Sequence, residues 1–280
     1  MIITDEIKAL KQIKCSEISS ENFLMIGDEL GKQLQGDLQR DSLLRKVLLN
    51  EDGTSLIRQD QKVVRTERGT VEWVSPKPEY YVQENCLLDS SAPLGDQLYK
   101  GFSTTLNSLL RQENNILPQL CGKVIEHTRR LIKYSTFSPA TIRAMCTELA
   151  SVNLKPDTLV CGASVYEQLS KEGFAGFFDS PDHESTLYST HLGILNAFDD
   201  KPIKVQTDRF LEENDRVIPP FAAFLFAKDV YAGVWGYRNN LVTQPIEQYN
   251  MGTGYLGWFF SQIQYCHLNP HAVVGLTYID

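Results

Sequence analysis

The sequence predicts an α+β fold, because helical and strand patterns both extend over long parts of the chain. Hydrophobic residues recur every three or four positions in residues 20–49 and again in residues 94–134, which indicates amphipathic helices. Elsewhere, β-branched and aromatic residues gather in short runs bounded by turn-forming residues, which is typical of strands. These elements follow one another in an unusual order.

The composition is that of an ordinary soluble globular protein of 280 residues, long enough for one or two domains. A formal net charge of -8 argues against a broad basic surface that binds nucleic acid by counterion release. The first residues lack the apolar segment and cleavage site of a signal peptide, and charged or polar residues interrupt every apolar run. We therefore expect a protein made in the cytosol, without a membrane partner.

Six cysteines are scattered along the chain without C-x-x-C spacing: Cys15, Cys86, Cys121, Cys146, Cys161 and Cys266. Reduced thiols that serve as small apolar residues fit this pattern better than a disulfide framework does.

Residues 20–49 predict one amphipathic helix or a helix pair with Ser20 as N-cap. Its apolar stripe consists of Phe23, Ile26, Leu30, Leu34, Leu38, Leu44, Val47 and Leu48. Residues 54–90 change to a strand pattern on both sides of 67–69, which predicts a β-hairpin, and Pro76 and Pro78 limit its second strand. Since both strands are rich in charge, we expect an extended arm rather than a core sheet.

Residues 94–134 predict a long helical segment that Pro118 breaks or kinks. Ser138 and Pro139 then form an N-cap and first position of a further helix. The next stretch predicts a strand at 158–161, a tight turn and a helix that Ser164 and Glu167 open as a capping box and Gly173 closes.

Residues 174–200 are polar and irregular, and we expect a surface loop there. The segments "PIKVQTD", "PPFAAFLFAKD" and "VYAGVWGYR" predict strands, with turns at 213–215 and 228–229. The chain closes with the predicted strand "HAVVGLTYID" after a turn at Asn269 and Pro270.

Gly252, Gly254 and Gly257 match the G-x-G-x-x-G dinucleotide fingerprint. That motif requires a preceding strand, a following helix and an acidic residue about 20 positions on. The residues after Gly257 are aromatic and β-branched, and Pro270 would stop a long helix. We therefore interpret the glycines as positions of turns or close backbone approach.

Cys266, His267 and His271 resemble metal ligands, but Asn269 and Pro270 break the helix that would align the two histidines. We favour a structural role over a metal site. A second group consists of Asp182, His183, Glu184 and His191, for which a solvated loop is the better interpretation.

Cys161 ends an apolar run and is interpreted as a core thiol rather than a nucleophile. The acidic pairs at 199–200 and 212–213 are expected to be solvated on the surface. Signatures of serine hydrolases, phosphate-binding loops, zinc proteases and kinases are missing. We assign no catalytic, cofactor-binding or metal-binding residue and no cofactor, and we do not expect an enzyme.

The order of elements resembles the major capsid proteins of tailed bacteriophages, the Hong Kong phage capsid fold, over residues 20–280. Three stretches carry the resemblance: "KPDTLVCGASVYEQL", "RVIPPFAAFLFAKDVYAGVWG" and "YCHLNPHAVVGLTYID". It implies a capsid fold with an N-terminal arm, an extended β-hairpin loop, a peripheral domain with a spine helix, and an axial domain. It places the arm at 1–53, the loop at 54–92, the peripheral domain at 93–156, the axial domain at 157–249 and the return strands of the peripheral domain at 250–280.

The resemblance implies a major capsid protein that self-assembles through hexamers and pentamers into an icosahedral shell around a dsDNA genome. The protein would lie in the virion and assemble in the host cytoplasm. Expected partners are further copies of itself and packaged DNA without sequence-specific contact, with scaffolding, portal or decoration proteins also compatible. Because the chain has no long N-terminal scaffolding segment, a separate scaffolding protein or none is expected, and no residue match places a lysine–asparagine crosslink.

Two alternatives stay open at the level of the sequence. Encapsulins share this fold, so the shell could enclose a cargo protein instead of DNA. A metal- or thiol-dependent soluble enzyme remains an option if Cys266, His267 and His271 converge in space.

Overall fold

The computed structural model describes residues 20–48, 64–65, 71–72, 79–89, 94–171, 177–179, 185–187, 202–209, 211–228, 234–249, 254–266 and 269–279. The chain forms two compact units. The first unit comprises Met1–Asp41, Arg58–Gln112 and Gly236–Gln264, and the second comprises Ser42–Ile57, Glu113–Trp235 and Tyr265–Asp280. Among the described residues, no helix has the length and apolarity needed to cross a membrane.

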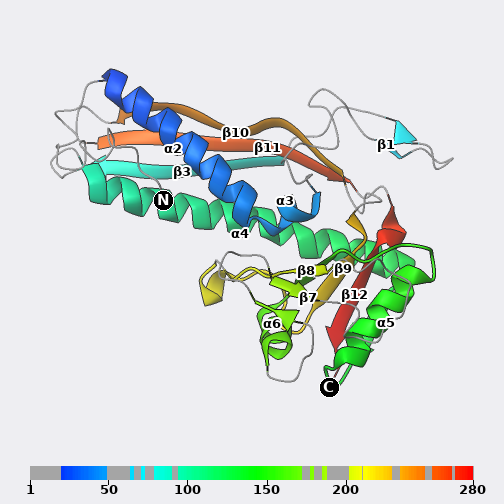
Figure 1. Cartoon of the computed structure of the whole chain (residues 1–280). Coiled ribbons are helices and arrows are strands. Elements are labelled where there is room, and N and C mark those ends of the chain that lie inside the picture. The colour runs from blue at the N-terminus through cyan, green and yellow to red at the C-terminus, as the bar shows by residue number, and fades with distance from the viewer. Residues whose placement is uncertain are drawn as a thin grey trace. The chain divides into compact units, whose positions relative to one another are not determined.

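The first unit contains a three-stranded sheet in the order β10-β11-β3 (Figure 1). Its long strands are β3 (Glu79–Asp89), β10 (Val234–Tyr249) and β11 (Gly254–Cys266). β11 lies in the middle and pairs antiparallel with β3. The last apolar stretch of the chain before the Asn-Pro turn is therefore a strand, as predicted.

A small hairpin precedes β3. Its strands β1 (Val64–Arg65) and β2 (Val71–Glu72) pair antiparallel, which confirms the predicted hairpin. The third segment of this region, β3, begins directly after Pro78 and belongs to the three-stranded sheet. The paired part of the hairpin is thus shorter than the whole charged region, because β3 has its hydrogen-bonding partner in β11.

Residues 20–48 form a helix pair, α2 (Ser20–Asp41) and α3 (Leu43–Leu48). Of the two predicted arrangements, one helix or a helix pair, the structure has the second. Leu34 and Leu38 of α2 are fully buried. So are Leu43 and Leu44 of α3. The three-to-four-residue spacing therefore does correspond to a buried face.

The long helix α4 (Leu94–Thr128) passes through Pro118 without ending. A proline removes one backbone hydrogen bond and strains the preceding turn, but burial on both sides of it can offset this cost. Leu117 and Cys121 are both completely buried. The prediction of helix as far as residue 134 is wrong, because Arg129 adopts a positive φ of 57° that ends the helix before the strand β4 (Leu131–Tyr134).

The second unit is built on a seven-stranded mixed sheet in the order β4-β12-β9-β5-β8-β7-β6, part of which is labelled in Figure 1. The remaining strands are β5 (Thr158–Cys161), β6 (Phe177–Phe178), β7 (Ser185–Leu187), β8 (Ile203–Gln206), β9 (Ala223–Phe226) and β12 (Val273–Tyr278). Only the pairs β4–β12 and β5–β8 are parallel among the described pairs. Every residue of β5 and β9 is buried, so the core lies along these central strands.

Two helices belong to this sheet: α5 (Pro139–Ala150) packs on β12 and β4, and α6 (Ala163–Ser170) follows β5. α5 begins as predicted, with Pro139 at its first position and Ser138 as N-cap. Short 3-10 turns occur at η3 (Glu213–Asp215) and η5 (Pro270–Ala272). Both fall on predicted turns.

The strand–turn–helix unit is confirmed, but its caps differ from the prediction. α6 begins at Ala163 with Gly162 as N-cap, so Ser164 lies inside the first turn and does not open the helix. The backbone amides of Ser164 and Val165 donate to the carbonyl of Pro220, at 3.1 and 3.2 Å. The helix ends at Ser170, before Gly173, because Lys171 is extended. A distant carbonyl thus takes the place of a local capping side chain.

The region 174–200 contains two short strands, β6 and β7, and is therefore not wholly irregular as predicted. β7 pairs antiparallel with β8. Strands of two and three residues are too short to show an alternating pattern in the sequence. They are recognised only by their hydrogen-bonded neighbours in the sheet.

The close approach at Gly162 predicts a large effect of a single methyl group. A Cβ atom there would lie 2.0 Å from the carbonyl oxygen of Pro219 and 2.7 Å from that of Pro220. Since both contacts are backbone, we expect Gly162→Ala to lower the free energy of unfolding by about 3 kcal/mol or more. Urea-induced unfolding measures this change.

The matched control is Gly122→Ala in α4, where nothing lies within 4 Å of an added Cβ. Alanine is the better helix former, so this variant should gain about 0.5–1 kcal/mol. Equal effects of the two substitutions would contradict the close approach.

Candidate functional site

The glycine fingerprint lies on a strand. Gly254 pairs with Asp89 and Gly257 with Asn85 across β11 and β3, while Gly252 lies outside the described residues. The register shifts between Tyr255 and Gly257, which marks a β-bulge. Because no helix N-terminus follows Gly257 within β11, the motif lacks the phosphate-binding geometry of a dinucleotide fold.

The structure describes two of the three residues of the Cys/His group, Cys266 and His271. Cys266 is the last residue of β11, and His271 is exposed in η5, where its amide donates to the Asn269 side chain at 3.2 Å. His267 lies outside the described residues. In the described part of the chain, no three His, Cys, Asp or Glu side chains gather as metal ligands do.

The second group of possible ligands, at 182–184 and 191, lies outside the described residues, as does the acidic pair at 199–200. Glu212 and Glu213 are exposed, as predicted.

Three thiols are buried in the core: Cys121, Cys146 and Cys161. Loss of hydration raises the pKa of Cys146 to about 12 and raises the pKa values of Cys121 and Cys161 as well, with the charge of Asp208 adding to the effect at Cys161. A thiol nucleophile needs the opposite shift. The interpretation of Cys161 as a core residue is therefore confirmed.

A buried ion pair, which the sequence analysis did not single out, holds α3 in the second unit. The guanidinium of Arg45 donates to both carboxylate oxygens of Glu113, with its Nε at 2.9 Å from Oε2 and its Nη2 at 2.7 Å from Oε1. Their side chains are only 1% and 2% exposed, so neither charge has water as an alternative partner. Such two-pronged contact is the strong form of the pair.

Further polar contacts surround the same short helix. Ser42 Oγ accepts from the backbone amide of Arg45 at 3.3 Å, and Asn114 Oδ1 accepts from that of Leu43 at 2.9 Å. At the other end, Lys228 Nζ donates to the carbonyl of Lys46 at 2.7 Å. Both ends of α3 therefore have partners for backbone groups that a helix leaves unpaired.

A sequence signal for this site does exist. The buried stripe of α4 contains Leu109, Leu110, Glu113, Asn114 and Leu117 at helical spacing. A carboxylate and an amide on such a stripe require buried partners. The stripe indicates that Glu113 and Asn114 need buried partners, but only the fold shows that α3 supplies them.

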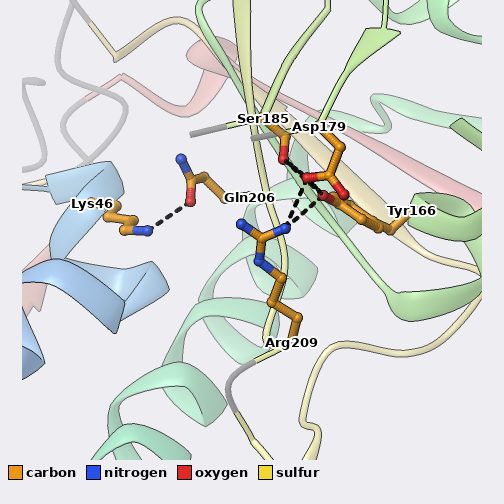
Figure 2. A network of polar contacts seen from close by, with 6 residues as sticks. All are labelled: Lys46, Tyr166, Asp179, Ser185, Gln206 and Arg209. Carbon is orange, nitrogen blue, oxygen red and sulfur yellow. Dashed lines mark hydrogen bonds and ion pairs between the residues drawn. The ribbon is translucent and has the colours of Figure 1, made fainter. Parts of the chain in front are cut away.

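A second polar cluster joins α6, β7 and the segments after β6 and β8 (Figure 2). The carboxylate of Asp179 accepts hydrogen bonds from the hydroxyls of Tyr166 and Ser185 and from Arg209, whose Nη1 lies at 2.9 Å. Arg209 also donates to the Tyr166 hydroxyl at 2.8 Å. In the same view, Lys46 Nζ donates to Gln206 at 2.8 Å.

The electrostatics of this cluster fit a structural contact between segments rather than a catalytic site. Partial burial alone would raise the pKa of Asp179, but the hydrogen bonds from Tyr166, Ser185 and Arg209 outweigh it and hold that pKa below its ordinary value. Burial, with the hydrogen bond to Asp179, raises the pKa of Tyr166 to about 12. Near neutral pH the phenol therefore keeps its proton and the carboxylate stays charged, so neither exchanges a proton.

No protein-family model and no curated protein sequence matches the chain. Solved structures share its fold at low sequence identity. A phage-related protein from Bordetella bronchiseptica is 9% identical with a TM-score of 0.55, covering 89% of this chain and 96% of that one. A virus-like particle from Pyrococcus furiosus is 14% identical with a TM-score of 0.51, covering 89% and 98%.

A holo encapsulin complex from Synechococcus elongatus is 9% identical with a TM-score of 0.52, covering 80% of this chain and 83% of that one. These structural neighbours confirm the resemblance to the phage capsid and encapsulin fold. Two of the three are described as a virus-like particle and an encapsulin complex, and the third as a phage-related protein. Because the covered shares are high on both sides, the likeness extends over most of the chain.

The buried ion pair predicts a strong asymmetry between single and double substitutions. Glu113→Gln leaves the Arg45 charge buried without its counter-charge, so the free energy of unfolding should fall by about 3–5 kcal/mol. The double variant Arg45→Met with Glu113→Leu removes both charges and should recover most of that loss. Urea-induced unfolding of both variants measures this recovery.

The matched control is Glu167→Gln, which removes the carboxylate that pairs with Lys171 on the surface. The side chains of Lys171 and Glu167 are 63% and 72% exposed. It should change stability by less than about 1 kcal/mol. A double variant as unstable as Glu113→Gln would show that the loss of stability does not come from the unpaired Arg45 charge.

The buried thiols predict protection from Ellman's reagent. In a variant that keeps only Cys121, Cys146 and Cys161, no thiol should react at pH 8 until urea unfolds the chain, after which three should react. Rapid labelling of the folded protein would contradict their burial.

The same thiols predict a loss of stability at high pH. Because folding raises their pKa values above the ordinary 9.0, their contribution is complete below about pH 9 and declines as the pH rises toward 12. The urea midpoint should therefore fall above pH 9, and less steeply for Cys146→Ala. A midpoint that rises over this range would contradict the direction of the shift.

Proposed function

We propose that this chain is the subunit of an icosahedral shell, a major capsid protein that encloses a dsDNA genome in a virion. One observation carries the proposal: solved structures described as a virus-like particle and an encapsulin complex share the fold over 80–89% of this chain. A fold by itself hosts many functions, so the particle must be tested directly.

In this proposal the parts of the chain take the roles that the resemblance implies. α4 is the spine helix, strands β5 to β9 of the seven-stranded sheet fall in the axial domain of residues 157–249, and its strands β4 and β12 fall in the peripheral domain. The segment 54–92 is the extended loop, with the hairpin β1–β2 at its centre. The arm is residues 1–53, and residues 93–156 and 250–280 make up the peripheral domain.

The shell is assembled by copies of this chain in hexamers and pentamers in the host cytoplasm. Scaffolding, portal or decoration proteins are compatible partners, and packaged DNA is held without sequence-specific contact. The second candidate is an encapsulin-type compartment around a cargo protein, which the encapsulin complex among the structural neighbours favours. Neither candidate needs a catalytic residue.

Size and cargo test the proposal. Size-exclusion chromatography with light scattering and negative-stain microscopy should show closed particles of megadalton mass. A monomer or small oligomer at every protein concentration, with bound metal and enzyme activity, would contradict a shell. Particles isolated from the native source should contain nuclease-protected dsDNA; a co-purified enzyme in its place would establish the encapsulin candidate.

The hairpin supplies a sharper prediction. Deleting the hairpin together with its flanking residues, 60–85, would remove the first half of β3 as well as β1 and β2. It would therefore damage the three-stranded sheet. Deletion of residues 62–75 removes β1 and β2 but keeps β3. Because an isolated two-stranded hairpin is marginal in water, we expect this variant to keep its unfolding temperature and to lose shell formation.

The control for this deletion is Gly122→Ala, which should assemble normally. Normal particles from the deletion variant would refute the arm role of the hairpin.

A further inference from the structure

Positive charge is concentrated around the C-terminal end of α4 and the strand β4. Residues 116–147 contain five Lys and Arg residues and a single acidic one, Glu126, although the whole chain carries a net charge of -8. The five cations are Lys123, Arg129, Arg130, Lys133 and Arg143. The net charge argues against a broad basic surface, but it leaves room for a confined one.

The fold brings the first four of these cations together in the second unit. Ile125, on the buried side of α4, faces Gly275 of β12, because its Cδ1 would lie 2.5 Å from a Cβ atom added there. Gly275 in turn pairs with Leu131 of β4. The last turns of α4 therefore lie beside the β4–β12 pair, and Lys133 projects from the same side of β4 as Leu131.

Three of these cations are exposed to solvent. Lys123 lies on the exposed side of α4, Arg129 in the connection to β4, and Lys133 on β4 itself. His127 is also exposed and lies one helical turn after Lys123. We call Lys123, His127, Arg129, Arg130 and Lys133 the β4 basic patch.

Arg130 fixes the backbone of this patch. Its Nη1 donates to the carbonyls of Glu148 in α5 and His271 in η5, at 3.1 and 3.2 Å. Its own carbonyl accepts from the amide of Gly275 at 2.9 Å. The connection between α4 and β4 is thus tied to three other elements, so the exposed cations around it start from a fixed backbone.

Stabilisation of α4 explains only part of this charge. Cations in the last turn of a helix interact favourably with its dipole, but the effect falls off within that turn. His127 is the basic residue of the last turn of α4, whereas Lys133 lies on the strand that follows the helix. Glu126, three positions from Lys123, offsets one charge at most. The patch therefore keeps an excess of positive charge that the helix does not require.

We propose that the β4 basic patch binds the phosphate backbone of duplex DNA, and that this surface faces the inside of the shell. The inference rests on the proposed shell function and deepens it, because it assigns the surface that meets the genome. Lysine and arginine side chains on phosphate oxygens hold a duplex without reading its sequence. The exposed hydroxyls of Ser135 and Thr136, directly after β4, supply further donors to phosphate.

A patch of this size predicts weak and salt-dependent binding by one subunit. Three or four phosphate contacts make the logarithm of the binding constant fall with that of the salt concentration with a slope of about -3. In a shell, many copies meet one DNA molecule, so that weak contacts act together.

Neutralising substitutions test the patch in solution. The triple variant combines Lys123→Gln and Lys133→Gln with Arg129→Asn, since asparagine tolerates the positive φ of 57° at this position. Fluorescence anisotropy with a labelled duplex of mixed sequence measures binding. We expect binding to weaken about 30-fold or more near 0.1 M salt, and the salt slope to lose about 3. Arg130 stays in place because it holds the backbone.

Matched controls separate the patch from charge in general. Arg216→Gln removes an exposed cation next to η3 and should leave binding unchanged, whereas Lys133→Gln alone should reduce the salt slope by about 1. Lys123→Arg together with Lys133→Arg keeps both charges and should keep binding. An unchanged slope in the triple variant, or equal weakening by Arg216→Gln, would overturn the patch.

Circular dichroism and urea-induced unfolding establish that each variant folds. If the triple variant misfolds, Lys123→Gln with Lys133→Gln replaces it, because both side chains are exposed. Its salt slope should then be smaller by about 2.

Lysine acetylation tests the patch inside the particle. Lys123 and Lys133 should react more slowly in DNA-filled particles than in particles assembled from the purified chain without DNA. Lys171, whose side chain is 63% exposed, serves as the reference in the same mass spectra. Equal protection of the patch in both kinds of particle would mean that a protein surface covers it, and would overturn the proposal.

The outcomes separate the two proposals. If the unaltered chain forms no particles, the shell function fails and the inner-face assignment fails with it, while the duplex titration still decides whether the patch binds DNA. If particles form around DNA and the triple variant binds duplexes as tightly as the unaltered chain, only the patch is overturned.

Discussion

The buried ion pair between Arg45 and Glu113 is the constraint on which the placement of α3 depends. Two charges that are almost fully withdrawn from water must meet each other, because the free-energy cost of leaving either one alone is several kcal/mol. A six-residue helix is too short to be stable by itself, so these contacts and the buried leucines must hold it. Polar partners at both of its ends complete the arrangement.

Close backbone approach imposes a second constraint in the same unit. Gly162 lets the carbonyls of Pro219 and Pro220 reach the first turn of α6, where the Pro220 carbonyl accepts from two amides. The segment before β9 is thereby tied to the helix after β5, and these two strands are neighbours in the sheet. Packing and hydrogen bonding therefore coincide at one glycine.

Local rules accounted for much of the fold. The start of α5 followed from Ser138 and Pro139, the β5–α6 unit from its apolar run and glycine, and the last strand from the Asn-Pro turn. Rules failed where distant groups decide: β6 and β7 exist through their pairing. Pro118 does not break α4, which leaves a kink as the other predicted effect. The polar clusters were not predicted, because their members are separated by up to 182 positions.

The sequence by itself determined the type of most elements and the rejection of the glycine motif, since periodicity, caps and turns act over a few residues, and the order of its elements resembled that of shell proteins. Only the tertiary structure decided the strand order of the two sheets, the partner of Glu113 and which large hydrophobic side chains stay exposed. These features depend on contacts between remote segments. Whether a charge or an aromatic ring on a stripe is buried, paired or exposed is determined by the segment that packs against it.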